Sequence, residues 1–227
     1  MASRKIVIID CLDGRLGDYC YERMAGYFVP EFEPVRIEAM TGAAPAGAAG
    51  WARRIDAAGM VIGGSQYSPL DPEPWIPVAE HFVAEFFDTG LPTLGICFGH
   101  ELLCSALGGK LTHRGELAVA LRRVRLRGDD PLFAGLGGET AQPVCHEVMA
   151  SETPRGFVTI GESDDCPIQV MRHETLPVWG VQFHPEMDAE IKVHDSDWIG
   201  LGDEEFAKSE GPAVMRNFFE ILKKTSA

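Results

Sequence analysis

A cysteine lies where a predicted strand gives way to a predicted helix, in the stretch Leu94-Gly95-Ile96-Cys97-Phe98-Gly99. A nucleophile on such a sharp turn needs small neighbours, because the turn is strained and the helix packs close to the strand. The pattern Gly-x-Cys-x-Gly is the thiol version of the nucleophile elbow. The helix also directs its positive end at the sulfur, which predicts a lowered thiol pKa. A buried structural cysteine is the alternative interpretation.

A possible base for this thiol occurs near the end of the chain, in the stretch Gln182-Phe183-His184-Pro185-Glu186. A cysteine nucleophile needs a base that takes its proton and returns it to the leaving amine, and the base needs an orienting carboxylate. His184 and Glu186 are of the right types, and Pro185 fixes the backbone between them. The tripeptide alone would be read as a surface loop, so its interpretation depends on the elbow.

Strands and helices alternate through the first half of the sequence. The run Ile6–Ile9 is apolar and β-branched, as in strands that helices cover on both faces. Further strands are predicted at 35–38, 59–62 and 93–96, helices at 16–28, 51–57, 76–87 and 98–107, and a loop at 42–50. This order predicts a doubly wound α/β fold with a mostly parallel central sheet and flanking helices. Cys97 would then lie at the carboxyl end of the fourth strand, where open sheets bind ligands.

The second half of the chain has a different pattern. Short apolar runs between turn signals, at 119–126, 157–160, 168–171 and 178–183, predict a few added strands, some of them antiparallel. Pro212 opens a C-terminal helix with one apolar stripe. No linker long enough to separate two domains interrupts the sequence, so we expect a single domain over residues 1–227.

Composition excludes several classes of function. The 34 acidic residues outnumber the 20 Lys and Arg residues, for a formal charge of −14, which opposes binding to nucleic acid and to anionic lipid surfaces. No apolar run approaches the roughly 20 residues of a membrane span. The six cysteines form no CxxC pair and are expected to be reduced. Because Ile6–Ile9 is too short for a signal sequence, the cytoplasm is the expected compartment.

With both motifs in this order, the chain resembles the class I (triad-type) glutamine amidotransferases over nearly its whole length. The resemblance also rests on Gly63-Gly64-Ser65 and on Leu107-Gly108-Gly109. It implies a catalytic triad of Cys97, His184 and Glu186. It further implies an oxyanion hole made by the backbone N–H groups of Gly64 and Phe98, and donors of this kind are typically worth about 3–4 kcal/mol each.

The chemistry implied by the resemblance is cleavage of a γ-glutamyl amide. Cys97 would attack the side-chain amide carbon, His184 would protonate the leaving amine, and water would hydrolyse the thioester to glutamate. These steps require no metal and no organic cofactor. Ser65 and Gln66 are expected to contact the substrate α-carboxylate.

Two positions depart from the family pattern. Members that use glutamine usually carry Gln four residues after the nucleophile, where this chain has Glu101. The Glu101 carboxylate would either bind the substrate α-ammonium or pair with a cation such as Arg114. The second departure is the stretch Cys145-His146-Glu147, expected in a substrate-facing loop. His146 would line the pocket or serve as a satisfied structural histidine.

Three functions remain open at this point. The first is a stand-alone hydrolase of γ-glutamyl amides or peptides, which the two departures favour. The second is a glutaminase subunit that delivers ammonia to a separate synthetase partner, and the third is a catalytically weak regulatory or binding member. A monomer and a two-fold dimer are both compatible with the sequence. The cluster His194, Asp195 and Asp197 is read as a solvated acidic loop rather than a metal site, since no third well-spaced ligand is evident.

Overall fold

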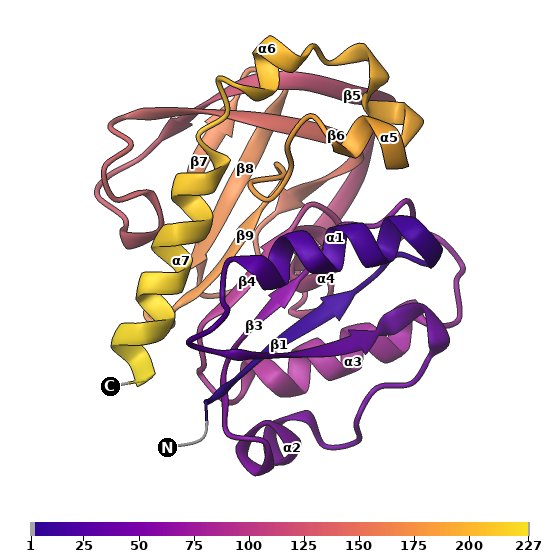
Figure 1. Ribbon diagram of the computed structural model, residues 1–227, viewed down its shortest axis with the longest axis vertical. Coiled ribbons are helices and arrows are strands. Elements are labelled where there is room, and N and C mark those ends of the chain that lie inside the picture. The colour runs from indigo at the N-terminus through magenta and orange to yellow at the C-terminus, as the bar shows by residue number, and fades with distance from the viewer. Residues whose placement is uncertain (1–2, 227) are drawn as a thin grey trace.

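A mixed sheet with helices around it forms the frame of the protein in the computed structural model, which describes residues 3–226 (Figure 1). Its strands are β1 Lys5–Asp10, β2 Glu33–Glu38, β3 Ala57–Ile62, β4 Thr93–Ile96, β5 Lys110–Leu126, β6 Glu139–Glu152, β7 Phe157–Ser163, β8 Cys166–His173 and β9 Val178–Val181. The α-helices are α1 Gly14–Gly26, α2 Ala48–Arg54, α3 Ile76–Phe87, α4 Phe98–Ala106, α5 Ile191–His194, α6 Asp203–Phe206 and α7 Gly211–Ser226. Short 3₁₀ helices are η1 Ala39–Thr41, η2 Pro131–Phe133 and η3 Ser196–Gly200. In space the strands follow the order β2-β1-β3-β4-β9-β8-β7-β5-β6.

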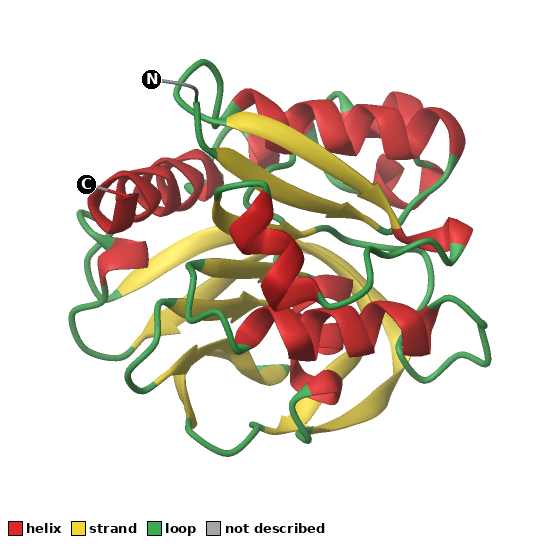
Figure 2. Ribbon diagram, turned by 90° about the horizontal axis from the view of Figure 1, so that it is seen from below, coloured by secondary structure: helices red, strands yellow, loops and turns green. Residues whose placement is uncertain are grey.

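The parallel half of the sheet consists of β2, β1, β3, β4 and β9. Along β1, Val7 and Ile9 belong to the core on one face, with apolar residues of α2, α3 and α4. Ile6 and Ile8 belong to the core on the other face, with residues of α1 and α7. Figure 2 shows helices on both sides of these strands. The predicted doubly wound α/β fold is therefore confirmed, and it explains why the β1 sequence is apolar at successive positions.

The antiparallel half is more extensive than the sequence predicts. Strands β8, β7, β5 and β6 continue the sheet beyond β9 with antiparallel pairing. The long β5 and β6 pair with each other from Lys110↔Glu152 to Arg125↔Glu139, with a register shift between His113 and Ala118. The predicted run 119–126 is thus only the second part of β5.

Strand β6 has no counterpart among the predicted strands, and the reason lies in its polar residues. Gln142 and His146 occupy buried positions of its alternating pattern, at 0% and 4% exposure, and so conceal the apolar alternation. The expectation that Cys145-His146-Glu147 forms a loop is consequently wrong. The helix predicted at 51–57 is also displaced: it spans Ala48–Arg54, and Ala57 already belongs to β3.

The segment after β9 packs against both α1 and the rest of the C-terminal region. Trp198, Met187 and Ile191 form an apolar cluster with Tyr19 and Cys20 of α1. The start of α7 lies against the same segment, because a Cβ added to Gly211 would come within 2.5 Å of the Pro185 carbonyl oxygen. None of the helices within residues 3–226 is long and apolar enough to cross a bilayer.

Candidate active site

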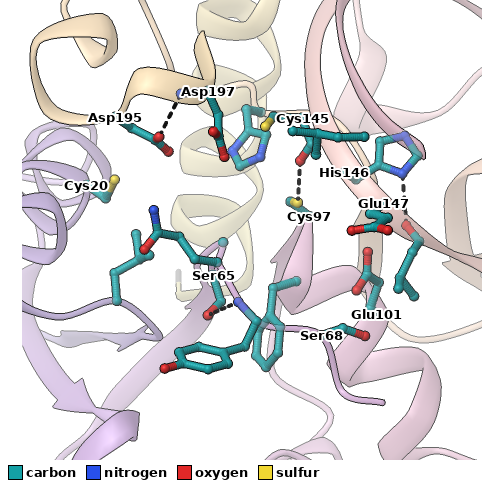
Figure 3. A pocket seen from close by; sticks show the side chains of 18 of the residues that line it. Cys20, Ser65, Ser68, Cys97, Glu101, Cys145, His146, Glu147, Asp195 and Asp197 are labelled. Atoms are coloured by element: carbon teal, nitrogen blue, oxygen red, sulfur yellow. Dashed lines mark hydrogen bonds between the residues drawn. The ribbon is translucent and has the colours of Figure 1, made fainter. Parts of the chain in front are cut away.

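A cavity of about 270 Å³ opens where the parallel strands β1, β3, β4 and β9 end. Eight of the site residues predicted from the sequence line it, although they come from distant parts of the chain. These residues are Gly64, Ser65, Gln66, Cys97, Phe98, Glu101, His146 and His184. Figure 3 shows Cys97, Glu101, His146 and Ser65 around this space.

The backbone at Cys97 has the geometry of an elbow. Its φ of 51° and ψ of −107° are unusual for a residue with a side chain, and they fall between the end of β4 and the first turn of α4. The N–H of Cys97 donates to the Val181 carbonyl at 2.8 Å, and the Cys97 carbonyl accepts from Glu101 N–H at 3.1 Å. Strain of this kind persists only when neighbouring structure holds it in place.

The two glycines beside Cys97 are required by close packing. A Cβ on Gly95 would lie 2.4 Å from the Gly99 carbonyl oxygen, and a Cβ on Gly99 would lie 2.3 Å from the Ile62 carbonyl oxygen. Both distances involve backbone atoms that cannot move aside. The predicted reason for Gly-x-Cys-x-Gly, close approach of helix and strand, is what these contacts show.

The Cys97 thiol is held in its protonated form at rest. Burial raises its pKa well above the ordinary thiol value, a negative charge on Glu101 would raise it further, and the Phe98 backbone N–H acts in the opposite direction. The expectation of a lowered thiol pKa is therefore wrong, because desolvation outweighs the positive helix end. The Cys97 Sγ–H donates to the Cys145 carbonyl at 3.4 Å. A base must remove this proton before the sulfur can react.

His184 is the side chain placed for that role. Its Nδ1 lies 2.9 Å from Glu186 Oε1, and the two residues are 6% and 1% exposed. Because Nδ1 is bound by the carboxylate, Nε2 is the nitrogen left to exchange a proton. The backbone N–H of His184 donates to the Pro143 carbonyl at 2.8 Å, which fixes the loop after β9 against β6.

Gly64 brings the nucleophile and the histidine together. A Cβ on Gly64 would lie 2.9 Å from His184 Cε1 and 3.8 Å from Cys97 Cβ, so only the absence of a side chain lets this loop approach both. The loop follows β3, and Gly63 N–H anchors it by donating to the Ile9 carbonyl at 3.0 Å. The backbone of Gly64 therefore lies beside Cys97 and His184, and its expected part in an oxyanion hole stays a prediction.

Glu101 is buried one helical turn after Cys97. Its side chain is 3% exposed, and its Oε1 accepts a hydrogen bond from Gln182 Nε2 at 2.9 Å. Burial raises its pKa to about 8, against a smaller opposing effect of the Gln182 hydrogen bond. The alternative pairing with Arg114 does not occur, because Arg114 binds Asp165 at 3.1 Å.

His146 both lines the cavity and has its ring nitrogens engaged. Its Nδ1 lies 2.8 Å from the Val148 carbonyl, and its Nε2 lies 3.5 Å from Arg114 Nη1. Burial lowers the pKa of His146 to about 4, so the ring is neutral near pH 7. With Nδ1–H donating to the carbonyl, Nε2 is an acceptor for the arginine. Its expected contact with substrate stays a prediction.

The loop residues expected to bind the substrate α-carboxylate lie at the cavity. The Ser65 hydroxyl donates to the Cys11 carbonyl at 2.7 Å and accepts from Tyr67 N–H at 3.2 Å, which shapes the loop. Gln66 is exposed and lines the same cavity. Their proposed contact with substrate is not tested by these distances.

Several lining residues have no counterpart among the predicted site residues. The Trp198 ring packs edge to face on His184, with centroids 5.2 Å apart and an interplanar angle of 86°. Asp71, from the loop before α3, also lines the cavity. The only sequence signal for Trp198 is a large aromatic residue in an otherwise polar segment, and nothing in the sequence links it to His184.

The acidic stretch near Trp198 is more closely associated with the site than a solvated loop would be. Asp195 and Asp197 line the cavity, and Asp195 accepts a hydrogen bond from the Asp197 N–H at 3.0 Å. His194 points elsewhere and stacks on Tyr19, with ring centroids 4.3 Å apart. Within residues 3–226 no three His, Cys, Asp or Glu side chains gather closely enough to hold a metal ion.

Comparison with known protein families identifies the class of protein to which this fold and cavity belong. The profile of the family described as "Glutamine amidotransferase class-I" matches residues 44–198, and the chain belongs to this family. Solved structures with the same fold include a glutamine amidotransferase from Thermotoga maritima, with a TM-score of 0.76, 16% identity and coverage of 100% of this chain and 99% of that one. A protein from Thermoplasma acidophilum, described as a putative subunit of GMP synthase, gives a TM-score of 0.73 at 17% identity, covering 99% and 96%.

Relatives with higher sequence identity share the name GMP synthase. The chain is 35% identical over 134 residues to a subunit of the glutamine-hydrolysing GMP synthase of Archaeoglobus fulgidus, which is 59% of this chain and 63% of that protein. It is 38% identical over 104 residues to the glutamine-hydrolysing GMP synthase of Clostridium novyi, covering 46% of this chain. That match spans only 20% of the length of the Clostridium protein.

Proposed function

We propose that this chain hydrolyses the side-chain amide of glutamine through a γ-glutamyl thioester on Cys97 and supplies the ammonia to a separate synthetase partner. The site geometry carries the first part: a strained cysteine elbow lies beside a buried His184–Glu186 pair separated by 2.9 Å. The names of the relatives, which describe glutamine-hydrolysing GMP synthases and one of their separate subunits, support the second part. This assignment favours the glutaminase over the stand-alone hydrolase that the two sequence departures indicate.

The positions of the side chains support the following order of steps. His184 Nε2 takes the proton of the Cys97 thiol, and the sulfur attacks the γ-carbonyl carbon. The backbone N–H groups of Gly64 and Phe98 stabilise the resulting oxyanion. When the C–N bond breaks, the nitrogen leaves with the proton held by His184. Water then attacks the thioester with His184 as base, which releases glutamate and returns the proton to the thiol.

Detection of the thioester tests this proposal directly. The protein is mixed with glutamine, quenched in acid and weighed by mass spectrometry, while glutamate release is measured in parallel. We expect a γ-glutamyl adduct and glutamate from the wild type, and neither from Cys97→Ala. Cys145→Ala is the matched control, because this thiol also lines the cavity but has no role in the proposed steps. An adduct that persists in Cys97→Ala would refute the assignment of the nucleophile.

A second candidate substrate is favoured by the charge of the cavity. Besides Glu101, whose raised pKa favours the neutral form, the lining that the structure describes contains four acidic residues and no Lys or Arg: Asp71, Glu147, Asp195 and Asp197. Such a lining suits a substituted γ-glutamyl amide whose leaving amine carries a positive charge. Comparing glutamate release from glutamine with release from neutral and cationic γ-glutamyl amides distinguishes the candidates. Faster turnover of a cationic amide by the protein alone would favour the stand-alone hydrolase.

A further inference from the structure

The carboxyl group of Glu101 is unusual because it is buried beside a nucleophile that must become negatively charged. It lies on α4 one turn after Cys97, and Figure 3 shows it directed into the cavity. An ionised carboxylate there would oppose the thiolate and would repel the carboxylate of a glutamine-like substrate. The protonation state of Glu101 therefore decides how it can act.

Among residues 3–226, no Lys or Arg side chain pairs with Glu101 to hold it in its ionised form. Within the described residues, Arg114 is bound to Asp165, and the cavity lining contains neither Lys nor Arg. The titratable groups that face Glu101 are acids, thiols and imidazoles: Cys97 and Cys104 of α4, Asp71 of the loop before α3, Cys166 of β8, and His113, His146 and Glu147 of β5 and β6. His146 is neutral near pH 7. Burial, and to a smaller extent the charge of Asp71, raise the pKa of Glu101 and so favour the protonated carboxyl group.

Gln182 determines which oxygen carries the proton. Its Nε2, which can only donate, lies 2.9 Å from Glu101 Oε1, so Oε1 acts as the acceptor. In a neutral carboxyl group the proton must then be on Oε2. Among the residues that the structure describes, none makes a hydrogen bond with Oε2, and the carboxyl group faces the cavity.

We propose that Glu101 binds substrate as a neutral carboxylic acid, with Gln182 holding Oε1 while the Oε2–H group donates a hydrogen bond to an oxygen of the γ-glutamyl moiety. This inference rests on the proposed function, because it assumes a γ-glutamyl substrate in this cavity. It reverses the expectation that an ionised Glu101 binds the substrate α-ammonium. In this form the carboxyl group is a donor, as a glutamine amide would be, and deprotonation removes the donor and adds a repelling charge. Substrate binding should therefore weaken as Glu101 ionises.

The test is the pH dependence of KM for glutamine in the wild type and in Glu101→Gln, between about pH 6 and about pH 10. We expect the wild-type KM to rise roughly 10-fold to 100-fold as Glu101 loses its proton, which is the loss of one hydrogen bond to a charged group. The KM of Glu101→Gln should lack this rise, because its amide donates at every pH. Glu116→Gln, which removes an exposed carboxyl group that does not line the cavity, should keep the wild-type profile.

Two kinetic results would overturn the proposal. One is an identical KM profile in the wild type and Glu101→Gln. The other is a wild-type KM that falls as pH rises, which would mean that the ionised carboxylate binds the substrate ammonium group. Absence of Cys97-dependent glutamate release at any pH would instead refute the proposed function.

Infrared difference spectroscopy distinguishes failure of the Glu101 proposal from failure of the proposed function, because it observes Glu101 without turnover. In Cys97→Ala, a protonated-carboxyl band should be present near neutral pH, should shift when glutamine is added, and should be missing from Cys97→Ala combined with Glu101→Gln. A spectrum without this band would refute a neutral Glu101. A band that glutamine leaves unshifted would refute the hydrogen bond to substrate.

Discussion

Replacement of Gly64 by alanine should impair catalysis by displacing His184. The added Cβ would lie 2.9 Å from His184 Cε1, at least 0.5 Å short of the 3.4 Å at which ordinary contact begins. The ring must therefore move by about half an ångström, and catalytic groups need positioning to within about that tolerance. Since a displacement of about 1 Å costs roughly 100-fold, we expect kcat/KM to fall about 10-fold to 100-fold, or about 1.4–2.7 kcal/mol of transition-state stabilisation.

Gly63→Ala is the matched control for this substitution. The Cβ on Gly63 would lie 3.0 Å from Met24 Cε, the flexible end of a side chain, and 3.4 Å from the Ile9 carbonyl oxygen. Neither contact involves the site, so Gly63→Ala should retain most of its activity. Glutamate release would be measured for both variants, and thermal unfolding would show that both are folded. Equal losses in the two variants, or full activity in Gly64→Ala, would refute the reasoning.

Three other predictions concern the surroundings of His184 and Glu101. Glu186→Gln should lower kcat about 10³-fold to 10⁴-fold while leaving KM nearly unchanged, because an amide donor at Nδ1 stabilises the wrong imidazole tautomer; steady-state kinetics and a normal circular dichroism spectrum would check this. Trp198→Ala should reduce kcat about tenfold by releasing the His184 ring, and a Trp198→Phe variant that fails to recover activity would contradict this explanation. The raised pKa of Glu101 means that its contribution favours the folded state most below pH 4.5 and declines as pH rises toward about 8. The free energy of unfolding of Glu101→Gln, measured with denaturant, should therefore rise relative to that of the wild type over that range, by up to about 4 kcal/mol at pH 8. A difference between the two proteins that does not change with pH would contradict this prediction.

Much of the fold could be predicted because its parallel half follows local rules. The continuous apolar run in β1 and the helical spacing of Ile76 to Phe87 reflect burial that neighbouring residues in the sequence reveal. The same holds in part for the elbow, since Gly95 is required by a contact with Gly99 inside one strand-turn-helix unit, whereas Gly99 is required by a contact with Ile62 of the neighbouring strand β3. Family membership followed from these motifs and is confirmed by the family profile.

The parts that escaped prediction depend on contacts between distant segments. Strand β6 is concealed because Gln142 and His146 are polar at buried positions. Their hydrogen-bond partners, Thr140 and Val148, lie only two residues away in the same strand, but the burial of these positions arises only in the folded sheet. The packing of Trp198 on His184 likewise has no local signature. The direction of the Cys97 pKa could not be read from the helix end alone, because the extent of burial appears only in the folded protein. The roles assigned to individual site residues stay predictions until the variants are measured.

The central place of β9 in the sheet has a consequence for folding. This strand follows β5 to β8 in the sequence but pairs directly with β4, so the pairing of Thr93 with Val178 closes a long loop. Closure of such a loop is slow compared with local helix formation. Cys97 and His184 come together only when this pairing forms, so the thiol lacks its base until then. Turnover can thus serve as a kinetic readout of this long-range strand pairing, independent of signals that report helix content.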